Sequence, residues 1–168
     1  EAEGDNFLHQ LATSGPMARS PRDLAALLET QSGPDLRVPN QLPKADVLAH
    51  IEAPIKGKRI GWLGDWGGAY PMEPGILEIC QNALKQMEEL GCVVEAVPAP
   101  FDAAAIWDSW ITLRSWAVAG GSSALYEDAK TREMLKPAAI WEIERGLEMS
   151  AMEVHRASVI RSQWFLRA

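Results

Sequence analysis

The sequence predicts an α/β fold that is rich in helices and contains one strand-helix-strand (βαβ) unit. Two short apolar runs, residues 58–63 and 92–97, are bounded by glycine or proline, as strands usually are. Between them apolar residues recur every three or four positions, which is the period of an α-helix. Because a helical crossover joins parallel strands, we expect the two runs to pair in parallel.

The first helix is expected to begin directly after Ser20. A serine can accept a hydrogen bond from the first helical turn, and Pro21 suits the first helical position because its missing N–H would be unpaired there. Asp23 favours the positive end of the helix dipole. The helix should stop near Ser32, and the following residues 33–57 are expected to form a proline-rich surface connection.

Three further helices are expected after the second strand. Asp102 can cap the first of them, and the paired glycines Gly120 and Gly121 are expected to end it, since glycine tolerates the left-handed backbone of a helix end. A second helix is expected to begin at Pro137 and to end at Gly146. The third should begin after Ser150, since a serine with Glu three residues later forms a capping box.

Two strands are too few for a stable parallel sheet, which is normally covered on both faces. The chain also contains seven tryptophans, whose large rings need more burial than a two-strand unit supplies. We therefore expect the strands to belong to a larger mixed sheet, with residues 1–168 forming one partial domain. The first residue is Glu1 rather than Met, which fits a chain that has been processed or trimmed as well as one that is a piece of a longer protein.

Composition excludes several classes of function. A net charge of −7 without a cluster of basic residues argues against direct nucleic-acid binding. No apolar run has the length of a membrane span and no leader is recognisable, so a cytoplasmic protein without a membrane partner is expected. Cys80 and Cys92 fall in apolar settings that favour packed, reduced thiols. The histidines share no ligand spacing, and neither a metal nor a cofactor is expected (His9, His50 and His155).

Several blocks resemble amidase signature enzymes in the order of that family. The block Gly-Pro-Met-Ala-Arg-Ser at residues 15–20, followed by Asp-Leu-Ala, is similar to the one that follows the catalytic core of these enzymes. The resemblance continues with Lys-Arg-Ile-Gly-Trp-Leu-Gly at 58–64, Leu-Gly-Cys-Val-Val-Glu at 90–95, Leu-Lys-Pro at 135–137 and Trp-Glu-Ile-Glu at 141–144. The series, more than any single block, carries the resemblance.

The resemblance implies a large mixed sheet wrapped by helices and an enzyme that hydrolyses a small carboxamide to a carboxylate and ammonia. In that family a serine attacks the carbonyl, a second serine relays the proton, a lysine acts as base and backbone N–H groups stabilise the oxyanion. These residues precede the block at 15–20, so the chain alone is expected to be inactive. Two alternatives are the A subunit of a tRNA-dependent amidotransferase, its glutaminase half, and a non-catalytic scaffold that self-associates into a homo-oligomer.

The segment Gly-Gly-Ser-Ser at residues 120–123 resembles the nucleophile region of the same family but stands in the wrong place. It follows the βαβ unit and lacks the further glycines of that region. We interpret Ser122 and Ser123 as structural and expect no catalytic residue in this chain. Lys56 and Lys58 lie in a basic stretch before a strand and do not fit the family's base.

The segment best placed to bind a ligand is the loop of residues 65–71. It leaves the carboxyl end of a parallel strand, where ligands of α/β sheets usually bind. Its glycines permit tight turns, and its aromatic side chains could form a pocket wall around a small amide. The predicted substrate-binding residues are Asp65, Trp66, Gly67, Gly68 and Tyr70.

Overall fold

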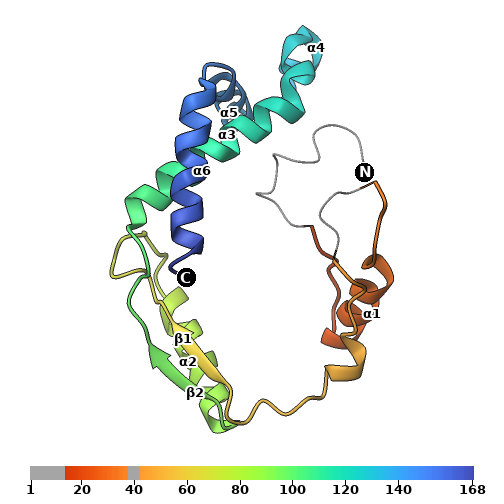
Figure 1. Cartoon of the computed structure of the whole chain (residues 1–168), viewed down its shortest axis with the longest axis vertical. Coiled ribbons are helices and arrows are strands. Elements are labelled where there is room, and N and C mark those ends of the chain that lie inside the picture. Colours follow the sequence, from red (N-terminus) through yellow and green to blue (C-terminus); the bar gives the residue numbers. More distant parts are fainter. Residues whose placement is uncertain (1–13, 38–41) are drawn as a thin grey trace. The chain divides into compact units, whose positions relative to one another are not determined.

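The computed structural model describes residues 14–37 and 42–168 and divides the chain into two compact units (Figure 1). The first unit comprises residues 1–54 and the second residues 55–168. Each unit is described by itself. His9, which the sequence places among isolated histidines, lies outside the described residues.

The first unit is organised around helix α1, Pro21–Gln31, which begins and ends as predicted. The Oγ atom of Ser20 accepts a hydrogen bond of 3.1 Å from the N–H of Asp23. At the other end the N–H of Ser32 donates to the carbonyl oxygen of Leu28. The cap therefore works through local contacts, which is why the sequence predicts it.

Part of the proline-rich connection folds back on α1. The Oε1 atom of Glu29 accepts hydrogen bonds from the N–H groups of Val47 at 2.7 Å and Leu48 at 2.6 Å. These two residues lie at the start of the short 3-10 helix η1, Leu48–His50, so the carboxylate serves as its cap. One side chain of α1 thereby fixes a segment almost twenty residues further along the chain.

The second unit begins with the predicted βαβ unit. Strand β1, Arg59–Trp62, and strand β2, Val93–Ala96, pair in parallel, and helix α2, Ile76–Glu89, connects them. The register sets Ile60 beside Val94 along a short ladder. Within the described residues the sheet has only these two strands, so both of its edges are open (Figure 1). Participation in a larger sheet remains a prediction.

Both cysteines are free thiols, as predicted. Cys92 is buried at the start of β2, and its Sγ donates a hydrogen bond of 3.4 Å to the carbonyl oxygen of Ile55. Cys80 is half-buried on α2.

Helix α3, Ala103–Glu127, is the longest element, and α5 and α6 pack against it (Figure 1). The remaining helices are α4, Ala129–Arg132, α5, Pro137–Leu147, and α6, Ala151–Phe165. The apolar side chains buried in this cluster are Leu113, Ala119, Ile143 and Ala157. None of the helices in the described part of the chain combines the length and apolar character needed to span a bilayer.

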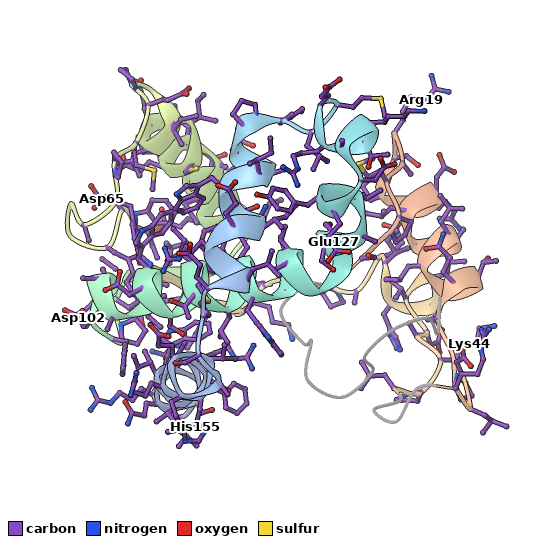
Figure 2. The ribbon with its side chains drawn as sticks, turned by 90° about the horizontal axis from the view of Figure 1, so that it is seen from above. Arg19, Lys44, Asp65, Asp102, Glu127 and His155 are labelled. Carbon is purple, nitrogen blue, oxygen red and sulfur yellow. The ribbon has the colours of Figure 1, made fainter. Side chains whose placement is uncertain are left out.

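The prediction that Gly120 and Gly121 end the helix after Asp102 is wrong. The Asp102 cap is present, since its Oδ1 accepts from the N–H of Ala105 at 2.7 Å, but α3 continues as far as Glu127. Figure 2 labels Asp102 and Glu127 at the two ends of this helix. Packing of the buried Ala119 and its neighbours against α5 outweighs the weak helix propensity of two glycines.

Gly146 lies inside α5, one residue before its end, and its role is tight packing rather than termination. A Cβ atom at this position would lie 2.2 Å from the carbonyl oxygen of Ser115 and 2.5 Å from the Cβ of Ala119. Both distances are far below van der Waals contact. The missing side chain therefore allows the backbones of α3 and α5 to approach each other directly.

Gly146→Ala is expected to destabilise the second unit by about 2 kcal/mol, because overpacking typically costs 1–3 kcal/mol and outweighs the gain in helix propensity. Thermal unfolding followed by circular dichroism measures the effect. Gly121→Ala is the matched control, since a Cβ atom there meets nothing within 4 Å. The control should stabilise the protein by about 0.5–1 kcal/mol. Equal melting temperatures for the two variants would contradict the close contact of α3 with α5.

The predicted capping box at the start of α6 is present. The Oε2 atom of Glu153 accepts hydrogen bonds from the N–H of Ser150 at 2.8 Å and from its Oγ at 2.7 Å. The Ser150 Oγ in turn accepts from the N–H of Glu153 at 3.3 Å. These hydrogen bonds hold the pKa of Glu153 below its ordinary value of 4.5.

A group with a lowered pKa stabilises the folded state above its unfolded pKa, and this contribution is lost as the pH falls through the folded pKa. Glu153→Gln keeps an oxygen acceptor but removes the titration. The melting temperature of the unsubstituted chain should therefore fall further below about pH 4.5 than that of Glu153→Gln. Glu88→Gln is the control, since that exposed carboxylate has no side-chain hydrogen bond within residues 14–37 and 42–168. Parallel pH curves for Glu153→Gln and the unsubstituted chain would refute the assignment.

Candidate functional site

The loop between β1 and α2 is held in a fixed conformation by its own backbone. The Oδ1 atom of Asp65 accepts a hydrogen bond of 2.9 Å from the N–H of Gly68, and the N–H of Trp66 donates to the carbonyl oxygen of Leu63 at 3.2 Å. Gly67 and Gly68 adopt φ values of 72° and 83°, a region that glycine enters without strain. The Asp65 carboxylate thus closes a tight turn at the carboxyl end of β1 (Figure 2).

Trp66 is the one non-glycine residue with positive φ among the described residues, at 59°. A bulky side chain in this left-handed region is uncommon and costs of the order of 1 kcal/mol, so surrounding contacts must hold it there. Strained residues of this kind cluster at ligand-binding and active sites. The outlier therefore draws attention to the same loop that the sequence pattern favours.

Tyr70 fixes the far side of the loop. Its hydroxyl donates a hydrogen bond of 3.0 Å to the carbonyl oxygen of Ala103, in the first turn of α3. The rings of Trp66 and Tyr70 lie 5.7 Å apart between centroids and are tilted by 58°, the geometry of a favourable aromatic pair. Both rings are half-buried, so each retains an accessible part.

The structure thus brings the five predicted loop residues together in one short, fixed segment. Asp65 is half-buried and engaged in the turn, whereas Gly67 and Gly68 are exposed. The arrangement offers two aromatic surfaces and an exposed glycine backbone that a ligand could approach closely. It contains no serine, cysteine or lysine nucleophile, so its chemistry is limited to binding and positioning a ligand.

The serines of the Gly-Gly-Ser-Ser segment lie in a different setting. Ser122 and Ser123 stand near the carboxyl end of α3, and both are half-buried in regular helix. Lys56 and Lys58 are exposed in the segment that leads into β1. These positions support a structural interpretation of all four residues. In the part of the chain that the structure describes, no group of three or more His, Cys, Asp or Glu residues could hold a metal ion.

A cavity of about 390 Å³ in the helical cluster has no counterpart in the sequence predictions. Its lining comes from α3, from the last turn of α5 and the residues that follow it, and from α6. Residues such as Asp108 and Arg156 are almost fifty positions apart in the chain. They form no local motif, so only the packing of the helices brings them together.

Comparison with known proteins identifies relatives of this chain. Residues 4–164 match the family model described as Amidase. The chain is 33% identical over 96 residues to the A subunit of the glutamyl-tRNA(Gln) amidotransferase of Pseudomonas putida (strain GB-1), a match that covers 56% of this chain and 20% of that protein. It is 34% identical over 91 residues to an acylamidase of Rhodococcus erythropolis, covering 52% of this chain and 19% of that protein. The matches thus span about a fifth of the length of these relatives.

A solved structure shares the fold. The crystal structure of a bacterial aryl acylamidase of the amidase signature family superposes with a TM-score of 0.75, at 24% identity, over 88% of this chain and 32% of that chain. This match confirms the predicted α/β class. With the family model extending over nearly all of its residues, the chain belongs to the Amidase family.

Proposed function

We propose that this chain is part of an amidase that hydrolyses a carboxamide to a carboxylate and ammonia. The observation that carries the proposal is the match of residues 4–164 to the Amidase family model. Similarity to an acylamidase supports the same reaction class. The matched regions cover about a fifth of the curated relatives, so this chain would supply only a part of the complete enzyme.

The chemistry proposed for the complete enzyme is acyl transfer. A serine would attack the amide carbonyl, a second serine would relay its proton to the leaving nitrogen, and a lysine would act as base. Water would then hydrolyse the acyl-enzyme and release the carboxylate. We place these three residues upstream of this chain, because the block at residues 15–20 resembles the one that follows the catalytic core.

The contribution of this chain is to bind substrate through the loop at the end of β1. The proposed contacts are those predicted from the sequence: Asp65, Trp66, Gly67, Gly68 and Tyr70. Three observations support this assignment: the position at a strand's carboxyl end, the positive φ of Trp66 and the hydrogen bond that ties Tyr70 to α3. A rigid aromatic wall would hold an amide by packing while the catalytic residues act on its carbonyl.

The chain alone should release no ammonia from acetamide, benzamide or glutamine, because the proposed nucleophile and base lie elsewhere. A coupled ammonia assay measures this, with the protein expressed together with its upstream sequence as the positive control. Turnover by the chain that disappears in Ser122→Ala or Ser123→Ala would overturn the structural interpretation of these serines.

Trp66→Gly in the protein expressed with its upstream sequence should raise KM about tenfold and leave kcat nearly unchanged, since a lost aromatic contact removes uniform binding. Glycine adopts the φ of 59° without strain, so the ring is removed while the backbone is kept. Trp141→Ala is the control, because that ring is 49% exposed on α5, away from the loop in sequence. Equal KM values for both variants would exclude Trp66 from the substrate pocket.

The second candidate is the A subunit of a tRNA-dependent amidotransferase, in which the same chemistry would release ammonia from glutamine. The 33% identity to the Pseudomonas putida protein favours it. The substrate profile of the protein with its upstream sequence separates the two. An amidase should accept simple amides by itself, whereas the amidotransferase component should act on glutamine and depend on its partner proteins.

A non-catalytic scaffold is the remaining alternative. Large apolar side chains are exposed on α2 and α6, among them Ile79 at 68% and Phe165 at 76%. Surfaces of this kind favour association. Sedimentation analysis distinguishes the cases, because a scaffold would form a defined oligomer, and a monomer with cooperative melting would exclude it.

A further inference from the structure

The cavity in the helical cluster of the second unit is separate from the proposed loop. It measures about 390 Å³, which lies within the usual range for sites that hold small molecules. The buried residues Ser109 and Ala157 line it, and they are joined by a hydrogen bond of 2.7 Å from the serine Oγ to the alanine carbonyl oxygen. Met149 and Ile160 add half-buried apolar surface. Buried and half-buried residues thus form the floor of the cavity, whereas Asp108, Glu148 and Arg156 lie exposed at its open rim.

Charged side chains of both signs line the same cavity. The cations are Arg145 and Arg156, and the anions are Asp108 and Glu148, with Glu153 already engaged in the cap of α6. Within the described residues, Asp108, Glu148 and Arg156 make no ion pair within 4 Å and no side-chain hydrogen bond. The charges of Arg156 and Arg145 do act on the Glu153 carboxylate, and they help to lower its pKa.

Arg145 makes two weak contacts besides its electrostatic interaction with Glu153. Its Nη2 donates to the Oγ1 of Thr112 at 3.3 Å, and its guanidinium lies 5.7 Å from the ring centroid of Trp141. The guanidinium is half-buried and its contacts leave most of its five N–H donors free. It is therefore well placed to receive a carboxylate in a charge-assisted pair.

We propose that this cavity binds a small zwitterion of dipeptide size, through an ammonium group and a carboxylate. The carboxylate would pair with Arg145 and Arg156, and the ammonium with Asp108 and Glu148. A ligand with one charge would leave the opposite set of side chains unpaired or repelled, which disfavours simple anions and simple cations. An aliphatic side chain would pack against Met149 and Ile160. This binding site is independent of amide hydrolysis.

Isothermal titration calorimetry of the chain with L-alanyl-L-leucine tests the proposal. Two analogues of nearly the same shape serve as matched controls: N-acetyl-L-alanyl-L-leucine keeps only the carboxylate, and L-alanyl-L-leucine methyl ester keeps only the ammonium. The zwitterion should bind at least about tenfold more tightly than either analogue, which corresponds to one charge-assisted contact. Equal binding of the three compounds, or no binding of the dipeptide, would overturn the proposal.

Two variants assign the contacts. Arg156→Met should weaken dipeptide binding about tenfold and leave binding of the methyl ester unchanged. Asp108→Asn should also weaken dipeptide binding about tenfold, but it should leave binding of the acetylated analogue unchanged. Both side chains are exposed, so the fold should persist, as circular dichroism will verify. Arg161→Met is the control, because it removes the same charge from α6 outside the cavity lining. Equal losses in Arg156→Met and Arg161→Met would show a general effect of net charge and would overturn the site.

Discussion

The direct contact between α3 and α5 is the constraint on which the second unit depends. Gly146 lies against the backbone of Ser115, which is completely buried, and Ile143 beside it is completely buried as well. The Ser109 hydroxyl, earlier on α3, holds α6 through the carbonyl oxygen of Ala157. Helix α3 therefore packs against two others: α5 through the Gly146 contact and α6 through a buried hydrogen bond.

The same helix also anchors the proposed binding loop. The carbonyl oxygen of Ala103 receives the hydroxyl of Tyr70, so the first turn of α3 fixes one end of the segment that leaves β1. The other end is fixed by the Asp65 carboxylate on the N–H of Gly68. A loop held at both ends can maintain a strained Trp66 and present its ring in one orientation, which limits the entropy lost when a ligand binds.

Local chemistry made much of this structure predictable, and packing over long distances accounts for the rest. The caps at Ser20, Asp102 and Ser150 follow from contacts within four residues, and each is present.

The glycine pair at 120–121 led to a wrong prediction because packing against α5 extends the helix through it. Gly146 lies near a helix end as predicted. Glycine is required there because the backbone of Ser115 on α3 leaves no room for a side chain, and no local sequence pattern shows that contact. The candidate loop could be proposed from its position after a strand and from its glycines. The positive φ of Trp66 could not, because no sequence pattern places a tryptophan in the left-handed region. The charged cavity could not be predicted, since its cations and anions come from three separate helices.

We propose that the chain is part of an amide hydrolase whose nucleophile lies outside it. Mass spectrometry of the protein expressed with its upstream sequence, after labelling with a fluorophosphonate that reacts with activated serines, tests this most directly. We expect a labelled serine that precedes residue 1 of this chain. A label on Ser122 or Ser123 would contradict it.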